Sequence, residues 1–329
     1  MSSDRLLEVS HLKMYHVIRK GLLGGKFFIK AVDDVDLTLD RGEALAIIGE
    51  SGSGKTTLGK TILRLYEPLD GKIIFDGRDV THISGKDLKR YRRETGFVQQ
   101  DPYGALPPFM SIRQILEEPL KIHKIGNKEE RLEKVYKALE EVRLTPVEDF
   151  INKYPHMLSG GQQQRVVIAR SIITDPKLVI ADEPVSMLDA SVRVEILRLM
   201  ESIQKKYQLG IIYISHDLST TKYFSNRINI MYAGKIVEGG PTREVIYNPQ
   251  HPYTQFLINA LPDPDANNRF VKRDVPPGEP PSLINPPPGC RFHPRCPLFI
   301  KGVCDKEDPG YTYVNGDHFV KCWYYEEKR

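Results

Sequence analysis

The sequence predicts an α/β fold with a mainly parallel sheet at its centre. Two apolar runs of strand length, at residues 177–181 and 210–215, are separated by a segment of helix length at 191–206. A third run, 44–48, leads through a glycine-rich loop into a helix-compatible segment at 57–65. Strands that alternate with helices are typical of parallel sheets, and strands buried on both faces read as continuous apolar runs.

The remaining elements follow from the spacing of apolar residues. Residues 32–39 alternate apolar and polar, as a half-buried strand does, whereas 128–143 carry apolar residues at helical spacing. We expect further strands at 6–15, 72–75 and 96–99, a glycine-containing loop at 16–30 and a helix at 166–173. The predicted organisation is a domain at 1–260 with a mostly helical subdomain at about 101–165, a proline-rich linker at 261–289 and a Cys-rich tail at 290–329.

The composition is that of a packed protein with no membrane span. The chain has 329 residues, of which 40% are hydrophobic and 27% charged, with a net charge of +4. No apolar run approaches the ~18 residues needed to cross a bilayer. The first residues lack a basic start followed by an apolar stretch, so we expect no secretory signal. The weak charge, without a basic run interleaved with aromatics, predicts no nucleic-acid partner.

Residues 49–56 fit the phosphate-binding pattern G-x-x-x-x-G-K-[ST]. The glycines let backbone N–H groups point at phosphates, and the following helix offers its positive end to the same anion. Lys55 is expected to bring charge to the β- and γ-phosphates of ATP, and Thr56 a hydroxyl to Mg²⁺. The predicted ATP-contacting residues of this loop are Gly49, Glu50, Ser51, Gly52, Ser53, Gly54, Lys55, Thr56 and Thr57. A chance Gly/Ser turn is the alternative, and the strand–loop–helix context argues against it.

Two acids, Asp182 and Glu183, follow the apolar run at 178–181. The carboxyl ends of strands in α/β folds border the crevice in which ligands bind. We therefore expect Asp182 to hold Mg²⁺, mainly through water, and Glu183 to orient and deprotonate the attacking water. A solvated strand end is the alternative.

The motif Leu158-Ser159-Gly160-Gly161-Gln162 decides the family. A phosphate loop, then this motif, then the Asp-Glu strand resembles ABC ATPases, and the loop begins a helix that can receive an anion. The resemblance implies a P-loop NTPase fold of the ABC type, with an antiparallel β subdomain and a helical subdomain. It also implies that ATP lies between the phosphate loop of one ATPase subunit and residues 158–162 of another, in a head-to-tail dimer.

Other motifs of that family match in order. Gln100 corresponds to the glutamine that contacts Mg²⁺ and the attacking water, with Gln99 as the alternative. Ser186 and Asp189 match the loop that crosses the dimer interface. His216 resembles the histidine that contacts the γ-phosphate. The aromatic residue that stacks on adenine is predicted to be Tyr15, with His16 and Phe28 as alternatives.

The C-terminal part resembles the extension of oligopeptide/dipeptide uptake ATPases. The segments that carry the resemblance are His251-Pro-Tyr-Thr, GEPPS, NPPPGC and RFHPRCP, and EPVSMLDASV is closest to the second of that family's two unlike ATPase subunits. ALPPFM at 105–110 departs from the commoner SLNPRM and puts the solute and the membrane partner in doubt. The resemblance implies a second ATPase subunit, two transmembrane permease subunits and an extracellular solute-binding protein as partners. The expected location is peripheral, on the cytoplasmic side of the membrane.

All four cysteines, Cys290, Cys296, Cys304 and Cys322, lie in the tail. A reducing compartment argues against disulfides, and four thiolates suit a tetrahedral sulfur site. The spacing resembles that of relatives with a [4Fe–4S] cluster. Zinc, and no metal or a disulfide, remain alternatives.

Four other functions are weighed against import of peptides. The same transporter type can carry oligosaccharides or nickel. A non-transport ABC ATPase would have two cassettes or long coiled-coil inserts, and an exporter would usually carry fused membrane helices; the sequence shows none of these. A regulatory ATP-binding protein without catalysis would not need Glu183 and His216.

Overall fold

The computed structural model describes residues 4–19, 25–260 and 278–326. The chain divides into two compact units, which we describe separately. The first comprises Met1–Leu7, Thr38–Ala44 and Ile74–Ile214, and the second comprises Glu8–Leu37, Leu45–Ile73 and Ser215–Arg329. Among the helices of the described ranges, none has both the length and the apolarity that a bilayer crossing requires.

The first unit contains three parallel strands in the order β6-β7-β8. They are β6 (Thr95–Val98), β7 (Leu178–Asp182) and β8 (Gly210–Ser215), and every residue of β7 and β8 is buried. Val98 is level with Ala181, and Asp182 with Ile214, so the strands end at one edge. The first unit also contains the end of β4 (Asp70–Phe75), which pairs antiparallel with β5 (Arg78–Asp79). Ile74 is opposite Asp79, and Phe75 is opposite Arg78.

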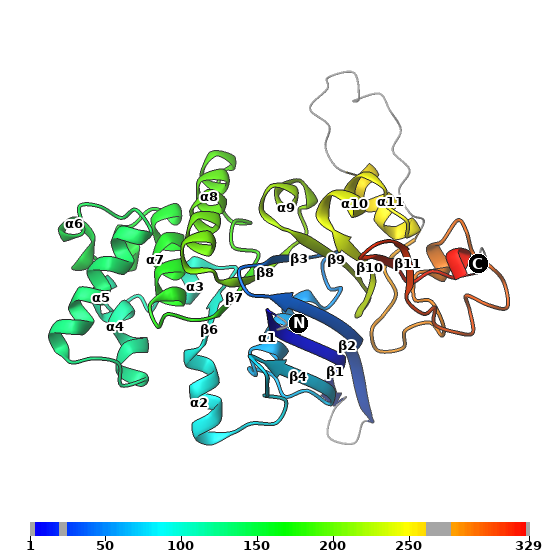
Figure 1. The fold of residues 1–329 in the computed structure, drawn as a ribbon, viewed down its shortest axis with the longest axis horizontal. Helices are drawn as coiled ribbons and strands as arrows, with labels where there is room; N and C mark the ends of the chain where they lie inside the picture. Colours follow the sequence, from blue (N-terminus) through cyan, green and yellow to red (C-terminus); the bar gives the residue numbers. More distant parts are fainter. Residues whose placement is uncertain (1–3, 20–24, 261–277, 327–329) are drawn as a thin grey trace. The chain divides into compact units, whose positions relative to one another are not determined.

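Most of the regular structure in the first unit is helical, and α4 to α7 gather in one group (Figure 1). Their bounds are α2 (Gly85–Arg93), α3 (Pro102–Ala105), α4 (Ile112–Ile122), α5 (Lys128–Glu141), α6 (Glu148–Ile151), the 3₁₀ turn η1 (Pro155–Met157), α7 (Gly160–Ile172) and α8 (Ala190–Tyr207). Arg170 of α7 donates to Glu118 of α4 at 2.7 Å and to the carbonyl of Ala105 at 3.1 Å. These contacts hold three helices together near the predicted helical subdomain.

Three of these helices begin with a capping box, which the local sequence specifies. Ser111, Asn127 and Ser159 each accept an N–H from the third helical residue, and the side chain of that residue accepts the N–H of the cap. A cap of this kind satisfies donors that have no partner within the helix. The helix starts at 112, 128 and 160 are therefore fixed by their sequences.

The second unit contains a sheet in which β3 (Ala44–Ile48) pairs in parallel with β9 (Arg227–Tyr232). Antiparallel pairing then continues from β9 to β10 (Lys235–Pro241), β12 (His318–Val320) and β11 (Thr312–Asn315). The helices of this unit are α1 (Lys55–Ile62), α9 (Leu218–Phe224), α10 (Thr242–Tyr247), α11 (Pro252–Asn259), η3 (His293–Arg295) and α12 (Trp323–Glu326). The C-terminal residues are thus part of a sheet.

A buried carboxylate ties this sheet to its surroundings. Glu238 of β10 is fully buried and accepts the backbone N–H groups of Gln250 at 2.8 Å and His251 at 2.9 Å. Nε2 of His318, on β12, lies 2.7 Å from Glu238 Oε1. Buried charges are stable only when they are paired in this way.

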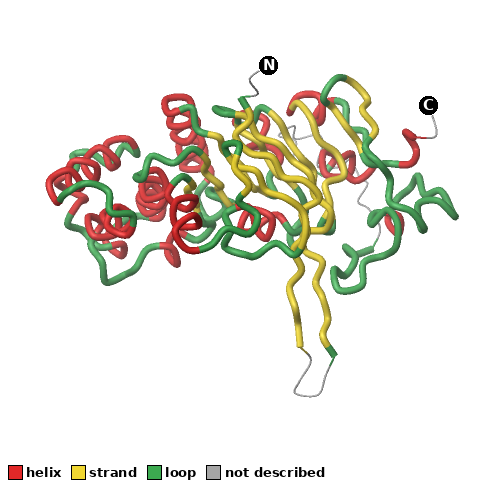
Figure 2. Tube along the Cα trace, turned by 60° about the horizontal axis from the view of Figure 1, so that its bottom comes forward, coloured by secondary structure: helices red, strands yellow, loops and turns green. Residues whose placement is uncertain are grey.

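The predicted loop at 16–30 is wrong at both ends. Strand β1 runs from Arg5 to Arg19, and β2 from Lys26 to Asp40, and Figure 2 shows the two strands side by side. The exposed fractions of Val17 and Phe28 are 54% and 46%, so pairing between the strands, and not burial, extends them. An alternation of apolar and polar residues indicates which residues of a strand are buried. The exposed ends of these strands therefore could not be predicted from such an alternation.

The other predicted elements agree with the structure to within a few residues. The helix expected at 57–65 is α1 and begins two residues earlier, and the helix expected at 166–173 is the second half of α7. Most of the predicted linker at 261–289 lies outside the described residues, and its described part, 278–289, contains neither helix nor strand. The domain limits at 260 and 290 remain predictions.

Candidate functional site

The phosphate loop connects β3 to α1 in the second unit, as its sequence predicts. Gly52 and Gly54 have φ angles of 77° and 106°, which favour glycine. A Cβ on Gly54 would meet the carbonyl oxygen of Ala31 at 1.9 Å, and one on Gly49 would meet that of Met231 at 2.0 Å. The loop is therefore packed so closely on neighbouring backbone that only glycine fits at these positions.

Lys55 is buried within this loop. Its Nζ donates to the carbonyl oxygens of Gly49 at 2.7 Å and Glu50 at 2.8 Å, and to Ser53 Oγ at 3.4 Å. The ammonium group lies under the curl of the loop as a result. A positive charge inside a ring of backbone groups at a helix N-terminus is suited to an anion such as a phosphate.

The aromatic residues proposed for adenine differ in their contacts. The Tyr15 hydroxyl donates to Asp33 Oδ1 at 2.5 Å, and burial together with this bond raises the pKa of Tyr15. Nε2 of His16 lies 3.3 Å from Oγ1 of Thr57, in the first turn of α1 directly after the phosphate loop. The geometry favours the alternative, His16, as the aromatic residue next to the loop; Phe28 is exposed.

The two acids lie where the strands of the first unit end. Asp182 is the last residue of β7 and is 4% exposed. Glu183 has a left-handed backbone with φ 46°, and its N–H donates to the carbonyl of Ile214 at 2.9 Å. Residues other than glycine seldom adopt this backbone conformation, and those that do are concentrated at functional sites.

Gln100 is the glutamine that reaches the acids. Its Nε2 donates to Glu183 Oε2 at 3.0 Å, whereas Gln99 lines a separate hollow with Arg92 and His123. Ser186 Oγ also donates to the backbone carbonyl of Glu183, at 3.1 Å. The structure thus brings Gln100, Glu183 and Ser186 together, as an arrangement for positioning a water molecule would need.

The motif at 158–162 forms the start of α7. The Gln162 N–H donates to Ser159 Oγ at 3.3 Å, and the Ser159 N–H donates to Gln162 Oε1 at 3.0 Å. Ser159 is exposed, and a Cβ on Gly161 would meet Val192 at 2.8 Å. The positive end of a helix of 13 residues is therefore presented at the surface of this unit.

Two further predicted residues lie at the ends of regular elements. Asp189 is exposed and precedes α8, and His216 is exposed and follows β8. The N–H of Asp217, next to His216, donates to Ser215 Oγ at 2.9 Å. Their chemistry stays a prediction.

The cysteine tail does not form a ligating group in the structure. All four cysteines are free, and the described ranges contain no group of three or more His, Cys, Asp or Glu side chains that could hold a metal ion. The Cys290 N–H donates to the carbonyl of Cys304 at 2.9 Å. Burial, and then the neighbouring thiols, raise the pKa of Cys290 and Cys322 to about 12. The expected iron–sulfur site is therefore not supported by this geometry.

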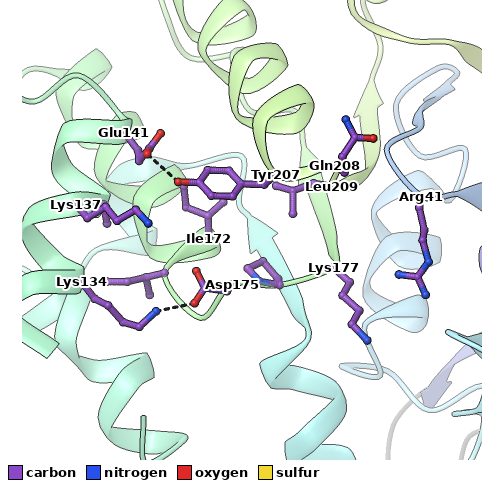
Figure 3. A pocket seen from close by; sticks show the side chains of 13 residues that line it. Arg41, Lys134, Lys137, Glu141, Ile172, Asp175, Lys177, Tyr207, Gln208 and Leu209 are labelled. Carbon is purple, nitrogen blue, oxygen red and sulfur yellow. Dashed lines mark hydrogen bonds and ion pairs between the residues drawn. The ribbon is translucent and has the colours of Figure 1, made fainter. Parts of the chain in front are cut away.

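A cavity of about 390 Å³ in the first unit is a separate feature (Figure 3). Lys134 Nζ lies 2.6 Å from Asp175, and the Tyr207 hydroxyl donates to Glu141 at 2.7 Å across its wall. Although burial opposes it, bonds from Lys206 and Tyr207 lower the pKa of Glu141. None of the described residues that line this cavity belongs to the motifs above, so it is no candidate for the nucleotide.

Contacts that the sequence did not predict reach the phosphate loop from the C-terminal region. The Glu50 N–H donates to the Tyr253 hydroxyl at 2.9 Å, and Arg295 Nη1 lies 3.4 Å from Glu50 Oε2. The segments containing Tyr253 and Arg295 stood out in the sequence only by their resemblance to a family. No local pattern indicates a contact between residues so far apart in the chain.

Comparison with known proteins identifies the family. Residues 32–186 match the family ABC transporter, and residues 237–304 match the family described as oligopeptide/dipeptide transporter, C-terminal region. The oligopeptide transport ATP-binding protein AppF of Bacillus subtilis (strain 168) is 42% identical in an alignment of 328 residues that covers 98% of each chain. The dipeptide transport ATP-binding protein DppF of Escherichia coli (strain K12) is 42% identical over 97% of this chain and 94% of its own.

Solved structures agree with this assignment. The dimeric structure of the ATP-binding cassette MJ0796 in a post-hydrolysis state, bound to ADP and Pi, matches with a TM-score of 0.63 and 28% identity over 72% of this chain and 99% of its own. CbiO1 from Clostridium perfringens, part of an ABC transporter complex, matches with the same score and identity over 75% of this chain and 92% of its own. The chain therefore belongs to the ATP-binding proteins of ABC transporters, and it carries the C-terminal region of the oligopeptide/dipeptide transporter family.

Proposed function

We propose that this protein binds and hydrolyses ATP to power an importer of oligopeptides or dipeptides. The observation that supports it most is the buried Lys55 beneath a glycine loop at a helix N-terminus, in a chain that also has the C-terminal region of peptide transporters. Peptides are preferred over oligosaccharides or nickel because the two relatives described above are named for oligopeptide and dipeptide transport. The intact acids argue against a purely regulatory ATP-binding protein.

Each motif has a role in this proposal. Backbone N–H groups of residues 49–57 and the ammonium of Lys55 bind the phosphates, and Thr56 and Asp182 hold Mg²⁺ with Gln100. Mg²⁺ supplies charge to the phosphate oxygens when it is bound. Glu183 accepts the proton of the attacking water, which Gln100 orients, and His216 contacts the γ-phosphate. The contact of 3.0 Å between Gln100 and Glu183 supports this pairing.

The adenine would stack on His16 rather than on Tyr15. The support is the contact between His16 and Thr57, which places this ring beside the first turn of α1. Stacking on an aromatic face requires only that the ring be accessible at the right distance from the phosphates.

A second ATPase subunit would complete the site. We infer a head-to-tail pair in which Ser159, Gly161 and the start of α7 face the γ-phosphate bound by the partner, with Ser186 and Asp189 at the interface. The exposed, capped start of α7 and the dimeric form of the MJ0796 cassette support this arrangement. A partner of a different sequence, two permease subunits and a solute-binding protein are the remaining proposed partners. This assembly would place the chain at the cytoplasmic face of the membrane.

The cysteine tail is a second, separate proposal. The concentration of all four cysteines in one segment, with a spacing that resembles that of relatives with a cluster, favours a [4Fe–4S] cluster, with zinc as the alternative. The geometry described above does not fit a completed site, so no step of hydrolysis is assigned to it. Iron, sulfide and zinc analysis of the full chain purified without oxygen tests the idea. A protein free of all three would contradict it.

Phosphate release by the assembled transporter tests the main proposal. Glu183→Gln should retain ATP binding while hydrolysis falls by roughly 10²- to 10⁴-fold, the usual contribution of a general base. Lys55→Ala should abolish tight nucleotide binding. Turnover of Glu183→Gln at the rate of the unchanged protein would exclude Glu183 as the base, and the absence of any ATP binding to the unchanged protein would exclude the function itself.

A further inference from the structure

Glu50 of the phosphate loop makes contacts through its backbone N–H, its carbonyl and its carboxylate. The N–H of Glu50 donates to the Tyr253 hydroxyl at 2.9 Å, its carbonyl accepts from Lys55 Nζ at 2.8 Å, and its carboxylate lies 3.4 Å from Arg295 Nη1. Two of these three contacts come from the C-terminal region. All of the groups belong to the second unit.

The two groups from the C-terminal region are themselves firmly placed. Tyr253 is fully buried in α11, and its ring centroid lies 4.5 Å from that of Tyr232 and 5.6 Å from that of Phe292. The side chain of Arg295 is 7% exposed, and its Nη1 also lies 3.3 Å from the Tyr232 hydroxyl. Burial raises the pKa of Tyr253, so its hydroxyl stays protonated at neutral pH. Side chains packed in this way have little freedom to leave the loop.

A further stretch of the C-terminal region borders the loop. Pro280 and Leu283 line a small hollow together with residues 50–53, and the carbonyl of Leu283 accepts the N–H of Lys30 at 2.9 Å. The loop thus meets the C-terminal region through α11, through η3 and through this proline segment. Ordering a loop before its ligand arrives removes part of the entropic cost of binding.

The charge at Glu50 matters as much as its position. A carboxylate in a loop that binds phosphates repels the ligand, and a carboxylate that faces a guanidinium does so far less, because the pair is neutral overall. Since Lys55 donates to the carbonyl of the same residue, a shift of Glu50 would also move the contact that holds Lys55. Arg295 controls the repulsion by offsetting the charge of the carboxylate, and Tyr253 controls the position of Glu50 by holding its N–H.

We propose that Tyr253 and Arg295 are positioning residues of the phosphate loop, through which the C-terminal region sets the affinity of this protein for a nucleoside triphosphate. The inference rests on the proposed function, because it requires that the loop bind ATP. It concerns affinity and not the chemical step, so the Michaelis constant for ATP should change more than the turnover number.

Equilibrium binding of the fluorescent analogue mant-ATP with Mg²⁺ to the full chain tests this proposal. Tyr253→Phe removes one hydrogen bond and should weaken binding roughly two- to tenfold, since a neutral bond of this kind has a modest net effect. Arg295→Met should weaken it by at least as much. Adding Glu50→Gln to Arg295→Met should restore much of the affinity, because the unpaired carboxylate is then gone. Tyr247→Phe and Arg243→Met, at exposed positions of α10, are the matched controls.

The outcomes separate this inference from the proposed function. Binding by both variants within twofold of the unchanged protein, while Lys55→Ala binds nothing, would overturn the inference and leave the proposed function standing. Failure of the unchanged protein to bind mant-ATP would overturn the function. A purely structural role would lower the melting temperature of Arg295→Met without rescue of affinity by Glu50→Gln, and that result would also refute the inference.

Discussion

A buried histidine should make the stability of this protein depend on pH. His251 is 1% exposed, and its Nδ1 accepts the N–H of Tyr253 at 3.1 Å as the cap of α11. Its Nε2 has no hydrogen-bond partner among the described residues. Burial, opposed by the charge of Glu238, lowers the pKa of His251 from 6.5 to about 4. The folded protein therefore keeps this imidazole neutral.

The size of the effect follows from the difference between the folded and unfolded chains. Above pH 6.5 the imidazole is neutral in both, and it adds no pH dependence. Between pH 6.5 and 4 only the unfolded chain binds the proton, so stability falls as the pH falls. At ~1.4 kcal/mol for each tenfold change in proton affinity, the loss approaches roughly 3 kcal/mol below pH 4 and is about 2 kcal/mol at pH 5.

Urea unfolding followed by tryptophan fluorescence measures this loss. Trp323 is the only tryptophan of the chain and belongs to the same unit as His251, so its emission reports the unfolding of that unit. The comparison is with His251→Asn, because asparagine also caps helices and does not titrate. Between pH 7.5 and pH 5, the unchanged protein should lose about 2 kcal/mol more than the variant does. Equal losses in the two proteins would refute the reasoning.

Three further substitutions test other features. Ser159→Ala removes the cap of α7 and should cost about 1 kcal/mol in urea unfolding; an unchanged midpoint would mean that the capping box is not formed. Gly54→Ala brings a Cβ within 1.9 Å of a carbonyl oxygen at φ 106°, so it should abolish ATP binding in a filter assay; normal binding would contradict the close packing of the loop. Burial opposes ionisation of Glu117, yet bonds from Lys121 and Arg113 lower its pKa. Glu117→Gln should therefore destabilise the protein above pH 4.5, and the difference should shrink as the pH falls through the lowered pKa. A difference that stays constant throughout an acid titration would refute the ion pairs as its cause.

Much of the fold could be predicted from the sequence because the parallel strands are buried on both faces. The apolar run at 178–181 is a buried strand, and Ser159 caps a helix; each structure depends on only a few neighbouring residues. The ends of β1 and β2 could not be predicted in this way. Val17 and Phe28 are exposed there and are held by strand pairing, and pairing between distant strands leaves no local pattern.

The site was predictable to the extent that its motifs are local. Gln100 was preferred over Gln99 from its place in the order, and the structure brings it to Glu183. Tyr15 follows from its position after the first strand, whereas in the structure His16 lies next to Thr57 in the first turn of α1, so the choice between the two rings stays a prediction. Adjacent residues of a strand point to opposite faces, and only the packed structure shows which face meets the loop.

Glu238 makes the last part of the chain difficult to separate from the rest. Its carboxylate collects donors from the segment before α11 and from β12, so a shortened protein that ends before residue 318 would keep a buried negative charge with one partner fewer. Leaving such a charge under-compensated typically costs several kcal/mol. Exchange of the tail between related transporters should therefore succeed only when residues 238 and 318 are transplanted together, because each is the buried partner of the other.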